Sequence, residues 1–292
     1  MRLALAVFVS LGGLVVPRLG AASVFDEFHG VRSTAMGGAN CGLGTSNDTL
    51  YLNPAGMAVM RRYAVELNYA YSGFDDLTNL NVSVVDSKSS PVAGGLAYTH
   101  ERGDPRGADP SLHRIYMATA YPISDAFAVG LSGHNIRGTF VDNGVRRDVA
   151  LYSGDVGIIT RLGQGIGLGV SAHNVVRTDL NRMTPLTFAG GVGWDSSPLA
   201  VAADFELDVH DAKHKLQTYR AGAEYLVGST FPIRAGWHRA PYTKADGTRG
   251  NENALSVGGG WVSPGGMIAV GGERSLERPK HWEIVVTLGL FL

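Results

Sequence analysis

Apolar and polar residues alternate with a period of two over most of the chain after residue 62. The last such stretch places apolar side chains at every second position, namely Trp282, Ile284, Val286, Leu288, Leu290 and Leu292. Because successive side chains of a β-strand point to opposite faces, this pattern predicts strands with one apolar and one polar face. It predicts about 14 strands, at 63–71, 77–86, 92–100, 112–121, 126–137, 149–161, 166–175, 185–194, 199–207, 216–227, 231–239, 253–262, 267–273 and 281–292.

The connections between these strands are alternately tight and long. The tight ones are 87–91, 122–125, 162–165, 195–198, 228–230 and 263–266, and the longer, more polar ones include 101–111, 138–148, 208–215 and 240–252. Short periplasmic turns that alternate with longer outside loops are typical of outer-membrane barrels. We therefore predict an all-β fold, a transmembrane antiparallel up-and-down β-barrel with both ends on the periplasmic side. A soluble β-sandwich or solenoid, with the apolar face turned inward, is the alternative.

Residues 1–22 have the layout of a secretion signal. Arg2 is the positive region, Leu3–Val16 the apolar core, and Gly20–Ala22 a small-residue cleavage site. The apolar run of 14 residues is shorter than the roughly 17–25 that a membrane-spanning helix needs. We expect this signal peptide to be cleaved and the protein to be exported to the outer membrane of a Gram-negative cell. Its partners there would be outer-membrane lipids, lipopolysaccharide and the barrel-assembly machinery.

A glycine-rich segment without a helical or strand period, residues 23–61, precedes the first strand. It contains turn signals, and its apolar residues need a surface to pack on. A barrel of about 14 strands has an interior too wide for its wall side chains to fill. We therefore predict that residues 23–61 form a plug, or hatch, inside a barrel made of residues 62–292; a disordered leader is the alternative. The predicted plug residues are Gly37, Gly38, Asn53, Pro54, Ala55 and Gly56.

Charged residues of both signs fall on the polar faces of the predicted strands. Opposite charges on neighbouring strands can pair across a sheet. This favours an ion-pair network that supports the wall or holds the plug, with a polar pore constriction as the alternative. The predicted lumen-facing charges are Glu66, Arg114, Asp155, Asp204, Glu206, Arg220, Glu224, Arg234 and Glu283.

Composition gives little support for nucleic-acid binding or for a disulfide framework. The chain has 25 Lys and Arg residues against 26 Asp and Glu residues, a net charge of −1, without the basic excess of a nucleic-acid binder. The single Cys41 cannot form an internal disulfide. No phosphate-binding loop of the P-loop form is present.

Two groups of residues have the residue types of chemical sites. His210 and His214 have a spacing that can present metal ligands from a helix, but they fall in a charged predicted loop, which favours solvated side chains. Ser and His residues share strand faces in two similar stretches, Gly130–Asn135 and Gly169–Asn174, with the residue types of outer-membrane lipases. We interpret that repeat as structural, and we predict a non-enzyme without metal or cofactor.

Two stretches near the N-terminus, Ser33–Ala39 and Tyr51–Met57, resemble the N-terminal signature of the FadL and PorV/PorQ superfamily of outer-membrane barrels. Tyr219–Tyr225 and Pro232–Trp237 resemble a strand pair in the PorV/PorQ branch. The resemblance covers nearly the whole chain after the signal peptide. It implies a 14-stranded barrel whose N-terminal segment folds into the lumen as a hatch.

The resemblance implies two classes of function. FadL-type barrels pass hydrophobic molecules, such as long-chain fatty acids or aromatic hydrocarbons, across the outer membrane. PorV/PorQ-type barrels serve type IX secretion. We expect FadL-like passive transport of a small hydrophobic molecule, although the predicted outside loops are shorter than the apolar capture loops of FadL-type proteins. A PorV/PorQ-like role with a secretion or surface-assembly partner is the alternative.

Overall fold

The computed structural model describes residues 28–73, 76–103, 111–142, 145–177, 184–209, 215–244 and 248–292. The predicted signal peptide (residues 1–22), the first five residues of the predicted plug (23–27), and both His210 and His214 lie outside these ranges.

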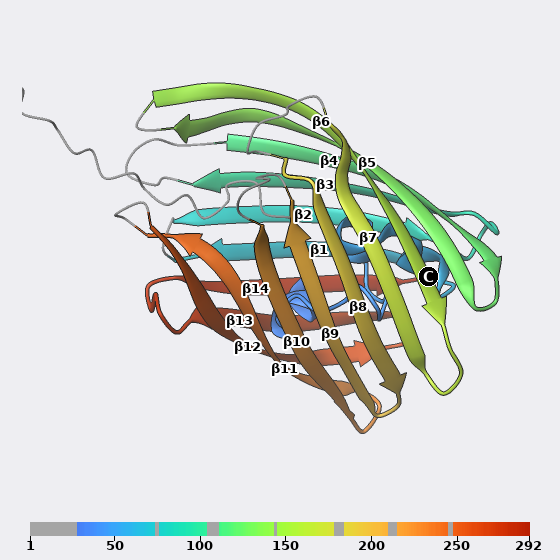
Figure 1. Cartoon of the computed structure of the whole chain (residues 1–292). Helices are drawn as coiled ribbons and strands as arrows, with labels where there is room; N and C mark the ends of the chain where they lie inside the picture. The colour runs from blue at the N-terminus through green and yellow to red at the C-terminus, as the bar shows by residue number, and fades with distance from the viewer. Residues whose placement is uncertain are drawn as a thin grey trace, which may run out of the picture.

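The described residues form fourteen strands that close into one barrel (Figure 1). The strands are β1 (Tyr63–Ser72), β2 (Leu77–Asp86), β3 (Ala93–Gly103), β4 (Ser111–Ser124), β5 (Phe127–Asp142), β6 (Val145–Arg161), β7 (Ile166–Arg177), β8 (Thr187–Ser196), β9 (Leu199–Asp208), β10 (Leu216–Val227), β11 (Phe231–Thr243), β12 (Arg249–Ser263), β13 (Gly266–Ser275) and β14 (Trp282–Phe291). Each strand pairs antiparallel with the next in the sequence, and β14 closes the ring on β1, where Phe291 lies opposite Ala64. The predicted antiparallel up-and-down barrel of 14 strands is confirmed, and the two-sheet sandwich is wrong.

The side chains of each strand alternate between the two faces of the wall. On β14, Leu288 and Leu290 are 47% and 60% exposed on the outer face, whereas Val285 and Thr287 are 0% and 1% exposed on the inner face. Since an outward apolar band requires an apolar surrounding, this arrangement is the inverse of a water-soluble barrel. Within the described ranges, no helix has the length and apolar character needed to cross a membrane.

The connections agree with the predicted rhythm at one end of the barrel and differ at the other. Tight turns such as Asp125–Ala126 and Pro264–Gly265 join the strands at the first end. At the other end, two predicted loops are shorter than expected. The predicted loop 138–148 is largely strand, since β5 continues to Asp142 and β6 begins at Val145, and β11 and β12 likewise take up most of the predicted loop 240–252. At these strand ends the regular alternation of apolar and polar residues is lost, while the backbone ladder continues.

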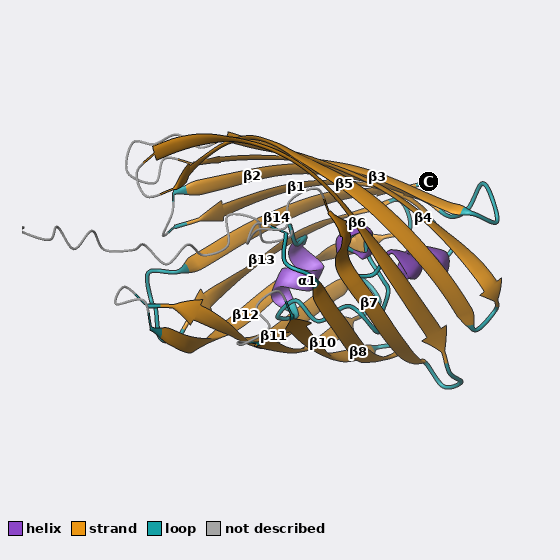
Figure 2. Cartoon of the chain, turned by 45° about the horizontal axis from the view of Figure 1, so that its top comes forward, coloured by secondary structure: helices purple, strands orange, loops and turns teal. Residues whose placement is uncertain are grey.

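The segment before the barrel wall, Phe28–Arg62, contains three short helices. These are α1 (Val31–Ala35), α2 (Thr49–Leu52) and the 3-10 helix η1 (Pro54–Ala58). Asn53 starts η1 by accepting a hydrogen bond from the Ala55 backbone N–H at 3.2 Å, and Pro54 occupies its first turn, where a missing N–H costs nothing. Gly37 and Gly38 have φ values of 66° and 81°, a left-handed conformation that favours glycine. Figure 2 shows these helices within the ring of strands.

Candidate functional site

Phe28–Arg62, called the N-terminal segment below, runs around the inner face of the wall. Its first helix, α1, packs against β11, β12, β13 and β14. Its last helix, η1, packs against β3, β4, β5 and β6, and α2 packs against β3 and β4. Between them, Cys41 and Leu43 lie against the inner faces of β7 and β8. The segment therefore contacts most of the circumference of the barrel.

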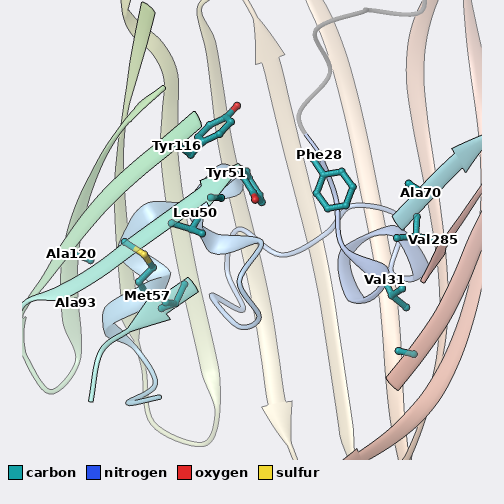
Figure 3. Close-up of a cluster of buried hydrophobic side chains, with 13 residues drawn as sticks. Phe28, Val31, Leu50, Tyr51, Met57, Ala70, Ala93, Tyr116, Ala120 and Val285 are labelled. Atoms are coloured by element: carbon teal, nitrogen blue, oxygen red, sulfur yellow. The ribbon is translucent and has the colours of Figure 1, made fainter. Parts of the chain in front are cut away.

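An apolar cluster fixes the α2 and η1 part of this segment (Figure 3). Leu50, Tyr51 and Met57 are at most 1% exposed and pack against the small wall residues Ala93 and Ala97. The Tyr51 ring meets the ring of Tyr116 on β4 edge to face, with centroids 4.9 Å apart, and the ring of Phe28 at 6.3 Å. Its hydroxyl accepts a hydrogen bond of 2.7 Å from the Asn81 amide on β2. Apolar burial and one satisfied hydroxyl therefore hold this part of the segment.

An ion-pair triad holds α1. Arg32 donates two hydrogen bonds to the Glu224 carboxylate on β10, at 2.9 and 3.2 Å, and Arg234 on β11 donates to the same carboxylate at 2.5 Å. All three side chains are at most 17% exposed. The Val31 N–H donates to the hydroxyl of Thr287, which adds a contact from β14. A bidentate contact between an arginine and a carboxylate fixes the orientation of helix α1 as well as its position.

Asp204 on β9 holds the middle of the segment. Its carboxylate accepts hydrogen bonds from the backbone N–H groups of Asn40 and Cys41, at 2.7 and 2.8 Å. Asn53 extends this connection, since its amide donates to the carbonyl of Cys41 at 3.2 Å and to the carbonyl of Ile158 on β6 at 3.1 Å. The side chain of Asn53 therefore joins the start of η1 both to the middle of the segment and to the wall.

A second set of polar contacts connects the segment with β1 and β2. Glu66 on β1 accepts the Asn47 N–H at 3.3 Å, and the Asn47 amide donates to the hydroxyl of Ser83 on β2 at 3.1 Å. Within the segment, Asp48 accepts the Gly30 N–H at 2.9 Å and the Ser33 hydroxyl at 2.6 Å. Hydrogen bonds therefore hold the segment together internally and also join it to β1 and β2.

The remaining predicted lumen-facing charges also lie on the inner face of the wall, several of them in ion pairs across neighbouring strands. Arg114 pairs with Glu101 at 3.2 Å on β4 and β3, and Arg220 pairs with Glu206 at 2.9 Å on β10 and β9. Asp155 lies among Ser and His side chains of β5 and β7. Glu283 lies opposite Glu273 of β13 and Ser72 of β1. Pairs of opposite charge, rather than a ring of one sign, therefore dominate these positions.

Glycines on the inner face give the segment its close fit, and sequence reasoning missed their role. A β-carbon built on Gly157 would lie 2.1 Å from the Oδ1 of Asn53, and one on Gly169 would lie 2.0 Å from the Cys41 carbonyl oxygen. Further inner glycines meet the segment in the same way: Gly95, Gly130, Gly167, Gly193, Gly222, Gly236 and Gly258. Only a residue without a side chain lets the segment approach the wall so closely.

Ser171 and His173 on β7 form a chain of contacts that ends on the N-terminal segment. The Ser171 hydroxyl donates to the Leu52 carbonyl at 2.9 Å, and Ser171 Oγ lies 2.9 Å from His173 Nε2. With the Ser171 proton on the Leu52 carbonyl, the contact to His173 is made by an Nε2–H donor, which is the reverse of the direction that activates a serine. His173 Nδ1 is 3.8 Å from Asp155 Oδ1, beyond hydrogen-bond range. The geometry is that of a structural contact.

Metal coordination finds no support in the part of the chain that the structure describes. Those residues contain no group of three or more His, Cys, Asp or Glu side chains placed to hold a metal ion.

The barrel resembles solved transporter structures in fold. The toluene transporter TbuX of Ralstonia pickettii matches with a TM-score of 0.65 and 13% identity over 90% of this chain and 98% of that chain. The toluene transporter TodX of Pseudomonas putida matches with 0.63 and 15% over 92% and 99%. A FadL homologue of Pseudomonas aeruginosa matches with 0.63 and 12% over 92% and 99%.

At these identities the likeness establishes the fold, and it confirms the predicted resemblance to FadL-type barrels at that level. No protein-family model and no curated protein matches the sequence. A closed barrel with an apolar outer face, together with these structural neighbours, points to the outer membrane.

Proposed function

We propose that this protein is an outer-membrane channel for the passive uptake of small, uncharged hydrophobic molecules, with the N-terminal segment as its hatch. The observation that carries the proposal is the position of residues 28–62 along the inner wall of a barrel that has the fold of toluene transporters. An open porin has a polar, water-filled interior. Here helices and buried apolar side chains lie in that place.

An apolar inner surface near the loop end of the barrel supports a hydrophobic substrate. Leu112, Ile136, Val149 and Leu151, on β4, β5 and β6, form one cluster, and each is at most 8% exposed. A water-filled pore is lined by polar side chains, so a buried aliphatic cluster at these inner positions is closer to the interior of a channel for hydrophobic molecules.

The charge distribution favours an uncharged substrate over a fatty acid. Arg32 and Arg234 share the carboxylate of Glu224, while Arg220 and Arg114 lie against Glu206 and Glu101. A fatty-acid carboxylate would need one of these guanidinium groups to exchange its partner, and burying an uncompensated charge is costly. A monoaromatic hydrocarbon needs no such exchange, and we propose this class as the substrate.

Uptake by proteoliposomes tests the substrate class. We expect the protein to accelerate the entry of toluene over that of decanoate at equal concentration, and protein-free liposomes give the background. Equal acceleration of both would contradict the charge argument, and acceleration of neither would reject the transport function.

Deletion of residues 33–57 tests the hatch. We expect this variant to insert into planar bilayers and to show higher ion conductance than the full chain, since the contacts of α1, α2 and η1 with the wall are lost. Gel mobility before and after boiling checks that the barrel has closed. Unchanged conductance in a closed barrel would reject the hatch. No described contact favours the secretion alternative, and we do not propose it.

A further inference from the structure

A hollow of about 550 Å³ opens on the outer face of β12, β13 and β14. It exists because two outward positions are glycines. Gly272 lies between Val257 and Ile284 on the neighbouring strands, and Gly259 lies beside Val270. Most of the bordering side chains are apolar, with Val257 66% exposed, and the lining also includes Arg274, Glu273 and Glu283.

A cation and two tryptophans mark the end of this hollow that lies toward the loops. Arg274 pairs with Leu255 on one side and with Trp282 on the other, and Leu255 pairs in turn with Trp237. Tryptophan is enriched at the level of lipid headgroups. Arg274 is exposed, and within the described part of the chain its side chain makes one hydrogen bond, from Nε to the Pro279 carbonyl at 3.2 Å. Its terminal amino groups therefore remain available to an anion at headgroup level.

The floor of the hollow is backed by the N-terminal segment. It consists of the backbone at Gly258 and Gly271, which lie opposite one another on β12 and β13. Helix α1 lies directly behind it, so that a β-carbon on Gly258 would be 2.6 Å from the Ala35 β-carbon, and one on Gly271 would be 3.2 Å from Val31 Cγ1. The wall cannot recede toward the lumen at this point, and the hollow is therefore preformed.

We propose that this hollow binds one acyl chain of a phosphorylated outer-leaflet lipid, with a phosphate of that lipid on Arg274. The site opens to the membrane rather than to the lumen, so lipid reaches it directly. From the loop end toward the centre of the barrel, the site presents first a guanidinium between aromatic residues and then an apolar hollow. A lipid has its charged headgroup and its apolar chain in the same sequence. Guanidinium groups bind phosphate oxygens in pairs. The proposal rests on the outer-membrane location in the proposed function, but not on transport.

Native mass spectrometry of the full chain in mild detergent tests the site, with diphosphoryl lipid A as the probe and dephosphorylated lipid A for comparison. We expect one tightly retained lipid A per barrel. Arg274→Gln should lower the apparent affinity about tenfold, the size expected for one charge-assisted contact. Its matched control is Arg239→Gln, which removes an exposed outward cation on β11.

The hollow itself is tested by Gly259→Leu, which fills it and should also displace the lipid. Gly190→Leu is the control, because Gly190 faces outward on β8 and the nearest atom to its added β-carbon is 3.9 Å away. Equal retention by all four variants would overturn the site, and equal retention of dephosphorylated lipid A would overturn the role of Arg274. Retention of added n-decane in place of lipid A would show a solute site and overturn the proposal. If Gly259→Leu fails to close into a barrel, the comparison of Arg274→Gln with Arg239→Gln tests the site by itself.

Discussion

On the outer face of β7 and β8, Val170 and Phe188 are 58% and 46% exposed. On the inner face of the same two strands, Gly169 and Gly191 lie against the N-terminal segment at Cys41, where a single added carbon would overlap existing atoms. Residues on the two faces are neighbours along the chain, yet the two faces tolerate different substitutions. On these two strands the outer face needs an apolar side chain of any shape, whereas the inner face needs a particular shape and particular hydrogen-bond partners.

The difference follows from what each face contacts. Outside the hollow on β12–β14, lipid chains adapt to the surface they cover, so the outer face requires only that its side chains be apolar. The N-terminal segment is a fixed folded surface, and protein surfaces that pack at native density respond to a change of even one methylene group. A change of polarity should therefore do most damage outside, and changes of volume or hydrogen bonding should do most damage inside.

Leu288→Arg on the outer face should have the largest effect. Leu288 is 47% exposed in the middle of β14, and an arginine on the lipid face costs about 2–4 kcal/mol near the bilayer midplane. Denaturant unfolding from lipid vesicles measures this loss. Leu288→Ile keeps the face apolar and should be nearly neutral. Equal stability of the arginine variant and the wild type would show that this position does not meet lipid near the midplane.

Asp204→Ala on the inner face should come next. It removes the acceptor of the Asn40 and Cys41 N–H groups, and the loss of hydrogen bonds to a charged group costs about 1.5–3 kcal/mol. This loss should appear as weaker docking of the N-terminal segment rather than as unfolding of the barrel. Hydrogen exchange of the segment measures docking, and exchange of the strands is the internal reference. Asp204→Asn keeps an acceptor and should lose less. Faster exchange in the strands instead would assign Asp204 to wall stability.

The outer face explains why the strands could be predicted from the sequence. The alternation around Leu288 and Ile115 locates strands because only one face can be apolar, and tight turns such as Pro264–Gly265 separate them. The prediction weakened where that signal ends, at the polar strand ends near Asp142 and Arg249. There the backbone pairing continues without any apolar pattern to reveal it.

The inner face was predictable only in part. Charge on a polar face pointed to Arg234 and Glu224, but Arg32 was missed, because no periodicity links a residue of an irregular segment to a particular strand. The inner glycines were missed for a related reason. Runs such as Gly167-Leu168-Gly169-Val170 show glycine alternating with apolar residues, which is the available signal, but its meaning depends on what lies against the wall.

Gly169→Val tests that fit and should have a smaller effect than the loss of Asp204. Its β-carbon would lie 2.0 Å from the Cys41 carbonyl oxygen, and overpacking of this kind costs about 1–3 kcal/mol. We expect partial release of the segment and raised ion conductance in planar bilayers. Gly190→Val, on the outer face of the adjacent strand, is the matched control and should leave conductance unchanged. If both variants conduct alike, steric fit at the inner glycines does not hold the segment.

The smallest effect concerns the reactivity of Cys41 and leaves stability unchanged. Burial, and to a lesser degree the nearby Asp204 carboxylate, raise the pKa of this thiol from its ordinary value of 9.0 to about 12. A shift of three units lowers the reactive thiolate roughly a thousandfold between pH 7 and 9. Because Cys41 is the single cysteine of the chain, alkylation by iodoacetamide reports on this site alone. The folded protein should label slowly across that pH range, and Asp204→Ala should label faster because both the burial and the neighbouring charge are reduced. Labelling of the wild type at the rate of the unfolded chain would show that the middle of the segment leaves the wall readily, and that the close inner contacts do not persist.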